Sequence, residues 1–482
     1  MKTLNKIFTI SVEVLEFSFD LLIQLFADTP QKKKGYNAGF VSAGTLLSSF
    51  NYGFNLTGNR QLSVKKSFEN SMVVGGSGRG KSSAIILPTL FSTNGSFIIN
   101  DPSGELFAKS SMHLKNRGYN VRTINFSNHK LSSGYNPLDR AKTSSDIQKI
   151  ASLLIENSIG GKGKDPFWTL QSISLLTMLI SILKTQDKEY QNLYNVRQLL
   201  NALGGNPQSV DALFGQYADD VLYNEYKSFL SFDDKITSGV VASCKASLQI
   251  FNDLEVAQVT SYDNLDFNMF RESPTALFIN NSVSDQKYYS NITSIFFDQF
   301  FAYLMSRFPN KNEQNVFLLI DEASSLNLKG LEIAIANCRK MNSGILIMYQ
   351  SFQQCIHQYG KQTAEAIKSN CFSKLYFAGQ DLDTCKELSE LLGKYEYEDK
   401  EKRMRTREVM TPDEVRTIKD NRALIICGNK PPIMARLVPY YKRIRYKKYG
   451  SLPPLELSEQ ARHKVLAILP LKKIQNDVKA EQ

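Results

Sequence analysis

The segment VVGGSGRGKSSAII, Val73 to Ile86, is the most informative stretch of this chain. It matches the spacing G-x-x-x-x-G-K-[ST], which forms a phosphate-binding loop when it follows a strand and opens a helix. The amides of such a loop point at phosphate oxygens, the lysine reaches the terminal phosphates and the hydroxyl binds Mg²⁺. We expect Lys81 to be catalytic, Ser82 to bind Mg²⁺, and the nucleotide-binding residues to be Gly75, Gly76, Ser77, Gly78, Arg79, Gly80, Lys81, Ser82 and Ser83.

Short apolar runs alternate with helical stretches around this loop, which is the pattern of a parallel sheet covered by helices. Strand signals stop after YNPLD (Tyr135 to Asp139) and resume at residue 275, with helical segments at 167–184, 196–203 and 238–251 between them. The expected strands are 71–76, 96–101, 120–126, 275–280, 316–321, 344–350, 374–379 and 422–428.

The sequence therefore predicts an α/β fold with a mainly parallel sheet that is split by an all-α insertion. The division that we expect is an N-terminal amphipathic helix and linker (1–60), a first part of the nucleotide-binding domain (61–141), the insertion (142–268), the second part of the nucleotide-binding domain (269–450) and a C-terminal tail (451–482).

The run VFLLIDEA supplies the second half of a hydrolytic site. A buried strand that ends in Asp321 can hold the Mg²⁺ ion with its water shell, and Glu322 is placed to polarise an attacking water. The sequence NKPP (Asn429 to Pro432) lacks the aspartate of a guanine-reading N-K-x-D, and no LSGGQ-like signature is present. The missing signature argues against an ABC ATPase, and the missing aspartate favours ATP over GTP. We therefore expect ATP and Mg²⁺ as cofactors.

Two later residues are further catalytic candidates. Arg339 lies on a predicted helix ahead of the next core strand, and Gln350 ends that strand, where its side chain could sense a terminal phosphate. By spacing alone, a surface arginine and a capping amide are the commoner explanations of these two residues.

The composition favours a polyanionic partner or an anionic membrane face, because 58 Lys and Arg against 47 Asp and Glu give a net charge of +11. A merely basic soluble protein is the alternative. The segment 435–450 interleaves tyrosines with Lys and Arg, as single-stranded nucleic acid binders do, although an edge strand with a solvated tail would look the same. The six cysteines form no CxxC pair, so neither a disulfide framework nor a zinc site is indicated.

Residues 7–26 are long and apolar but contain Glu13, Glu16 and Asp20, whose charges offset the gain from inserting the apolar residues into a bilayer. We predict an amphipathic helix that packs on the chain's own core, on a partner or on a membrane surface. No cleavable signal peptide is apparent. The segment 167–184 is expected to be too short and too interrupted by polar residues to span a bilayer.

Taken together, the motifs resemble those of the TraG/VirD-type coupling ATPases of conjugative type IV secretion. The resemblance covers about 71–441 and rests, in order, on GGSGRGKSS, DPSGEL (Asp101 to Leu106), YNPLD, DPFW (Asp165 to Trp168), LIDEA, RKMNSGILIMYQS (Arg339 to Ser351), YG (Tyr359 and Gly360) and MTPDEVRTI with RALIICGNKPPI (Met410 to Ile433).

This resemblance implies a RecA-like P-loop NTPase core, a homo-hexamer around a DNA channel, and ATP-driven delivery of a relaxase-linked strand to a secretion channel. Arg339 matches the arginine that such rings insert into the neighbouring subunit's site, with Lys340 as the fallback, and Gln350 matches the glutamine of the next strand. Asp101 is expected near the phosphates, although Ser103 replaces the family's lysine, and the family's usual N-terminal membrane anchor is not apparent.

The first functional hypothesis is therefore a DNA-translocating ATPase that is cytoplasmic or attached to the cytoplasmic face of the inner membrane. Its expected partners are DNA, a relaxase or another secreted protein, and channel components, with a monomer as the alternative state without nucleotide. The second hypothesis is a nucleotide-gated receptor that recruits protein substrates without pumping DNA. A related ring ATPase that moves chromosomes or plasmids is the third.

Overall fold

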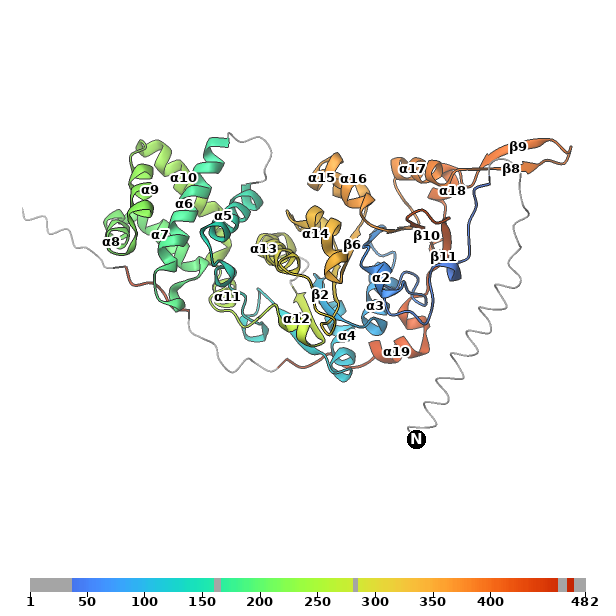
Figure 1. Cartoon of the computed structure of the whole chain (residues 1–482), viewed down its shortest axis with the longest axis horizontal. Helices are drawn as coiled ribbons and strands as arrows, with labels where there is room; N and C mark the ends of the chain where they lie inside the picture. Colours follow the sequence, from blue (N-terminus) through green and yellow to red (C-terminus); the bar gives the residue numbers. More distant parts are fainter. Residues whose placement is uncertain (1–36, 160–165, 281–284, 458–465, 472–482) are drawn as a thin grey trace, which may run out of the picture.

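The structure, a computed structural model, describes residues 37–159, 166–280, 285–457 and 466–471. Several predicted features lie outside these residues. They are the helix at 7–26, the part of the linker that precedes Asn37, the residue Asp165 and most of the C-terminal tail. The described chain forms one large sheet with helices on both faces, and a separate group of helices at one end (Figure 1).

The large sheet has the order β11-β10-β7-β1-β6-β5-β2-β4-β3. The seven strands from β7 to β3 pair in parallel, whereas β10 and β11 complete one edge in antiparallel pairing. The strands are β1 (Ser71–Val74), β2 (Ser96–Asp101), β3 (Asn120–Ile124), β4 (Thr275–Asn280), β5 (Val316–Ile320), β6 (Ser343–Tyr349), β7 (Ser373–Phe377), β10 (Arg422–Cys427) and β11 (Ile433–Arg436).

All eight predicted strands are present, and three further strands were not predicted. β11 is only four residues long, and β8 (Lys394–Glu398) and β9 (Met404–Glu408) form an exposed hairpin that projects from the edge of the molecule (Figure 1). The hairpin is rich in charge and has no buried face, so it lacks the apolar alternation that identifies a strand in sequence.

Alternate residues of each central strand face two different cores, because successive side chains of a strand point to opposite sides. One core lies under α2 (Val64–Ser67), α3 (Leu87–Ser92), α4 (Glu105–Asn116) and α19 (Ile444–Gly450). The other lies under α13 (Gln286–Met305), α14 (Leu331–Asn337), α15 (Phe352–Tyr359), α16 (Lys361–Ser369) and α17 (Leu382–Leu392).

Between β3 and β4 the chain is helical, and we call this group the helical region. It consists of α5 (Ser144–Ile159), α6 (Pro166–Lys184), α7 (Leu193–Gly205), α8 (Pro207–Tyr217), α9 (Asp220–Leu230), α10 (Asp234–Ser247) and α11 (Leu254–Val259).

Helix α6 is the central helix of this region, in contact with α5, α7, α8, α9 and α10. Within the described residues it is the one helix long and apolar enough to cross a membrane, so the expectation that it is too short and too polar to do so is wrong by that criterion. Its Leu175, Leu176, Leu179 and Leu183 are buried among the surrounding helices, and a helix in the middle of a bundle needs the same composition.

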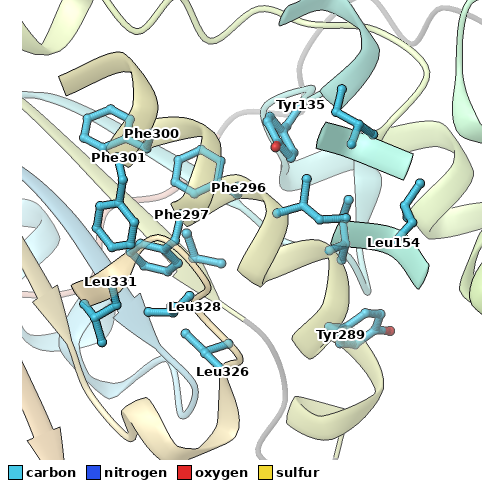
Figure 2. Packing of buried hydrophobic residues seen from close by; sticks show 14 of the residues in the cluster. Tyr135, Leu154, Tyr289, Phe296, Phe297, Phe300, Phe301, Leu326, Leu328 and Leu331 are labelled. Carbon is cyan, nitrogen blue, oxygen red and sulfur yellow. The ribbon is translucent and has the colours of Figure 1, made fainter. Parts of the chain in front are cut away.

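Helix α13 joins the helical region to the sheet. Its phenylalanines Phe296, Phe297, Phe300 and Phe301 form a continuous buried row, with Tyr135 and Leu154 on one side and Leu326, Leu328 and Leu331 on the other (Figure 2). The Tyr135 hydroxyl also donates to Gln299 Oε1 at 2.7 Å. The YNPLD motif therefore contributes to this junction.

Residues 466–471, which we call the C-terminal strap, pack on the helical region through one buried amide. Asn195 Nδ2 donates to Ala467 O at 2.9 Å, and Asn195 Oδ1 accepts from Leu469 N at 3.0 Å. Leu469 is buried and Asn195 has no exposed surface. One side chain thus binds two backbone groups of an extended segment from far along the chain.

Replacing Asn195 with alanine is expected to lower the free energy of unfolding by about 1–3 kcal/mol, because buried backbone groups of the strap would lose their partners. Proteolysis within the strap should also become faster. Denaturant unfolding and limited proteolysis measure the two effects. Asn201→Ala, on the exposed face of the same helix, is the matched control. Equal stability of the two variants would contradict this role of Asn195.

The tyrosines of the basic segment 435–450 are largely used inside the protein. The rings of Tyr440, Tyr446 and Tyr449 lie within 6.0 Å, 5.6 Å and 5.8 Å of the Phe91 ring, and Tyr449 also stacks on His113. Tyr446 and Tyr449 attach α19 to α3 and α4, and Tyr440 attaches the short 3₁₀ segment η10 (Tyr440–Lys442) before it. They are therefore not a free stacking surface for nucleic acid bases.

Candidate functional site

The carboxyl ends of the central parallel strands bring the predicted site together. Gly75 follows β1, Asp321 follows β5, Gln350 follows β6 and Asp101 ends β2, all at one edge of the sheet. Open α/β sheets bind ligands at this edge. The strand order places β1 between β7 and β6, so the P-loop emerges in the middle of the sheet.

The P-loop conformation requires glycine at particular positions. A Cβ at Gly75 would lie 2.7 Å from Phe377 Cβ, and Gly78 and Gly80 have φ of 72° and 84°. The Gly75 amide donates to Tyr349 O at 3.0 Å, which ties the loop to the end of β6. The loop tip formed by Ser77, Gly78 and Arg79 is exposed, so it is open to a ligand.

Lys81 turns back over the loop. Its Nζ donates to Gly75 O at 2.6 Å and to Gly76 O at 3.0 Å, and the side chain is almost completely buried. Burial lowers the pKa of Lys81, while Asp321 and Glu322 act in the opposite direction. The ammonium group is therefore held inside the loop, close to both acidic residues.

Ser82 and Asp321 meet as the motif predicts, since Ser82 Oγ donates to Asp321 Oδ2 at 3.0 Å. Burial raises the pKa of Asp321, and the Ser82 hydrogen bond and Lys81 counteract this effect. Asn100 Nδ2 donates to Asp321 O at 2.7 Å and fixes the end of β5. A hydroxyl and a buried carboxylate oxygen side by side form an all-oxygen donor set, which fits Mg²⁺.

Glu322 is held in an uncommon conformation beside this pair. Its φ of 50° and ψ of 51° lie in the left-handed region, which costs energy for a residue with a side chain. Gln350 Nε2 donates to Glu322 Oε1 at 3.3 Å. The two residues that were expected to act on the attacking water and the terminal phosphate are therefore in direct contact.

Asp101 lies in the same region, but its carboxylate is used by helix α4. It accepts from Leu106 N at 3.2 Å and from Phe107 N at 2.7 Å. Burial raises the pKa of Asp101 to about 7, against the effect of these two amides. In this structure Asp101 caps the start of α4.

Arg339 lies at the amino ends of the central parallel strands, whereas the P-loop lies at their carboxyl ends. It precedes β6, whose first residue Ser343 pairs with Val316, the first residue of β5. Since a strand rises about 3.3 Å per residue, Asp321 is roughly 16 Å farther along. Arg339 pairs with Glu69 of its own chain, with 3.3 Å between Nη1 and Oε1. It is therefore remote from the P-loop of its own chain.

The remaining loop residues are held locally. Ser83 Oγ donates to Gly80 O at 3.1 Å. Arg79 forms an ion pair with Asp420, which precedes β10, so the loop tip is linked to the antiparallel edge of the sheet.

Sequence reasoning missed Gln380 and Asn100. Gln380 Nε2 donates to Val74 O at 3.1 Å and to Phe377 O at 2.8 Å, which holds the end of β1 from which the P-loop emerges. Both residues are polar and lie at or just past the carboxyl end of a buried strand. That position is the signal that could have identified them.

The comparisons with known proteins agree on one family. The model of the family described as Type IV secretory system Conjugative DNA transfer matches residues 31–467. Protein VirD4 of Rhizobium radiobacter is 24% identical over 432 residues, which are 82% of this chain and 62% of that protein. The probable conjugal transfer protein TraG of Sinorhizobium fredii is 21% identical over 412 residues, 80% of this chain and 64% of that protein. The chain thus spans about three-fifths of the length of these relatives.

Solved structures of the plasmid coupling protein TrwB share the fold. The complex with a non-hydrolysable GTP analogue superimposes with a TM-score of 0.68 at 17% identity, over 91% of this chain and 99% of that one. The complex with ADP and Mg²⁺ has a TM-score of 0.68 at 18% identity, over 86% and 96%. The predicted RecA-like α/β core with a mainly parallel sheet is confirmed.

Proposed function

Because the chain belongs to the Type IV secretory system Conjugative DNA transfer family, we propose that it is an ATP-hydrolysing coupling protein that binds DNA and delivers it to a secretion channel. The observation that carries this proposal is the meeting of Ser82 with Asp321 and of Glu322 with Gln350 beside the buried Lys81. Those residues form a hydrolytic site and not only a phosphate-binding one.

In this proposal the P-loop amides and Lys81 bind the phosphates of ATP. Ser82 Oγ and Asp321 would hold Mg²⁺, which when bound neutralises charge on the phosphate oxygens. Glu322 orients the attacking water and accepts its proton, and Gln350 holds the Glu322 carboxylate until the terminal phosphate arrives.

The active form in this proposal is a ring, a homo-hexamer by the family resemblance. The position of Arg339 supports this, because a residue at the opposite edge from its own P-loop can serve only a neighbouring subunit's site. A ring of head-to-tail contacts brings opposite edges of adjacent subunits together. We place the ring in the cytoplasm at the inner membrane, with a relaxase or another secreted protein and channel components as partners.

Single-stranded DNA is expected to stimulate ATP hydrolysis by the assembled protein. The net charge of +11 favours a polyanion, and phosphate contacts release counterions, so the stimulation should weaken steeply as salt rises. The measurement is steady-state phosphate release with and without DNA over a salt series, with Lys81→Ala as the blank. Poly-glutamate tests whether charge alone is enough. If DNA neither binds nor changes turnover, the DNA-motor function is wrong.

One observation favours the second candidate, a nucleotide-gated receptor for protein substrates. A cavity of about 710 Å³ beside the helical region is lined by four acidic residues, Asp139, Asp187, Glu189 and Asp263, and by Lys188, which pairs with Asp139. Ala467 of the strap also lines this cavity. This surface therefore already holds one extended peptide segment next to several carboxylates. Slow hydrolysis unaffected by DNA, together with capture of a relaxase, would support the receptor over the motor.

A further inference from the structure

The turn that carries Arg339 is short and internally strained. The one-turn 3₁₀ segment η9 (Cys338–Met341) follows α14 directly, and Asn342 with a φ of 47° then leads into β6. A left-handed asparagine costs energy, so other contacts must hold this conformation. The direction in which Arg339 leaves the sheet depends on those contacts.

A buried arginine provides them from a different part of the chain. Arg271 Nη2 donates to Met341 O at 2.6 Å and to Ser343 Oγ at 3.0 Å, and its Nη1 donates to Gln314 O at 3.0 Å. One guanidinium group thus joins the end of η9, the start of β6 and Gln314, which lies two residues before β5. The backbone adds one more bond, since Gln314 N donates to Arg271 O at 2.8 Å.

Arg271 is only 3% exposed, and its direct partners are carbonyl and hydroxyl oxygens. Among the described residues no carboxylate lies within ion-pair distance of its guanidinium. Burial accordingly lowers the pKa of Arg271. A buried charge without a counterion is costly unless its hydrogen bonds are well formed, so these three bonds hold the turn in one geometry.

The opposite side of the turn is held by Asn70. Its Nδ2 donates to Ile335 O at 2.7 Å, and its Oδ1 accepts from Ile345 N at 2.9 Å. By contrast the Arg339 side chain is 68% exposed, and among the described residues its ion-pair partner is Glu69. An exposed ion pair is worth little, so the guanidinium of Arg339 can leave Glu69 while its backbone stays fixed. A rigid base with a movable tip suits a residue that reaches into another subunit.

Arg271 also belongs to the segment by which the chain leaves the helical region. It lies on α12 (Met269–Glu272), which follows 260–268 and contacts β2 and β4 beneath α13 (Figure 1). The ring of Phe270, its neighbour, packs on Phe300 of α13. The turn formed by η9 and Asn342, which carries Arg339, therefore contacts the segment that connects the helical region to the sheet.

We propose that Arg271 is a positioning residue for Arg339, which it holds in the direction that reaches the nucleotide of the neighbouring subunit. This inference rests on the proposed function, because it needs a ring in which Arg339 acts in trans. Arg271 touches no nucleotide itself. Its removal should damage the neighbour's site and leave the P-loop of its own chain intact.

The test is subunit mixing. Arg271→Gln alone is expected to lower turnover by roughly ten- to hundredfold, because a displacement of about 1 Å at a catalytic group can cost that much. Glu322→Gln subunits lack the expected general base and so do not hydrolyse ATP, but they keep ATP binding and an intact Arg339. When the two inactive proteins are mixed in equal amounts, turnover per Arg271→Gln subunit should rise to about half of wild type, since random neighbours supply an intact arginine at half of the sites.

The control is Arg117→Gln. Arg117 also donates to two backbone carbonyls and to Asn94 Oδ1, but it supports α4 and not the turn that carries Arg339. Any loss of activity in this variant comes from damage within its own subunit, so Glu322→Gln subunits should not restore it. Should Arg271→Gln fail to fold, Arg271→Lys, which keeps the charge but cannot bind three acceptors in the same fork, carries the same test.

A third mixture distinguishes a failure of the proposed role of Arg271 from a failure of the proposed trans role of Arg339. If Arg339→Ala mixed with Glu322→Gln regains turnover but Arg271→Gln in the same mixture does not, the role of Arg271 is overturned and the trans mechanism stands. If neither mixture regains turnover, the trans role of Arg339 itself is wrong. Full activity of Arg271→Gln alone would also overturn the inference.

Discussion

Arg339→Ala is expected to reduce ATP turnover of the assembled protein by about 10³–10⁵-fold while ATP binding to the P-loop is retained. The reason is positional: Arg339 lies at the sheet edge opposite to Lys81 and Asp321, so its loss removes positive charge only from a neighbouring subunit's site. Steady-state phosphate release measures the turnover, and titration with a fluorescent ATP analogue measures the binding.

Lys340→Ala is the matched control for this variant, because it removes the adjacent exposed cation from the same turn. It should keep turnover within a few-fold of wild type. If the large loss appears in Lys340→Ala and not in Arg339→Ala, the assignment of the trans residue moves to Lys340. If Arg339→Ala loses ATP binding as well, the residue acts on the fold or on assembly and not on the transition state.

The central strands and the P-loop could be predicted because their signals are local. A buried parallel strand is an unbroken apolar run, and β1, β5 and β6 each have one that ends in glycine or a polar residue. The spacing of the P-loop motif and the acidic pair after β5 then specified which strand ends must meet. The contacts between Ser82 and Asp321 and between Glu322 and Gln350 agree with that prediction.

The supporting residues could not be predicted, because their partners are far away in sequence. Arg271 contacts residues about 70 positions later, and Gln380 holds a strand some 300 positions earlier. Neither stands in a motif, and neither partner is recognisable without the strand order. The same limit applies to the tyrosines of 435–450, whose alternation with basic residues looks like a nucleic acid surface until their packing on Phe91 is seen.

The α6 sequence shows a different limit. An apolar helix of this length satisfies the composition of a membrane span and of a bundle core alike, so sequence alone cannot separate the two. The contacts of α6 with five neighbouring helices provide the missing information.

Lys81→Ala and Glu322→Gln are both expected to remove ATP hydrolysis but to differ in what they leave behind. Without Lys81 the loop loses the ammonium group that lies between Gly75 O and Gly76 O, and with it the charge-assisted contact to the phosphates. ATP binding should therefore weaken along with turnover. Glu322→Gln keeps the size of the side chain and its contact with Gln350, so ATP binding and nucleotide-dependent assembly should persist.

A glutamine at 322 can orient water but cannot accept its proton, and general base catalysis contributes about 10²–10⁴-fold to turnover. The expected result for Glu322→Gln is thus a ring that holds ATP without hydrolysing it, seen by sizing with and without ATP and by single-turnover phosphate release. Glu332→Gln, on an exposed face of α14, is the control. Normal turnover in Glu322→Gln would show that the strained backbone at this position serves folding and not catalysis. The general base would then have to be another acidic residue at the carboxyl ends of the strands. Asp101 would be the first to test, because burial raises its pKa to about 7.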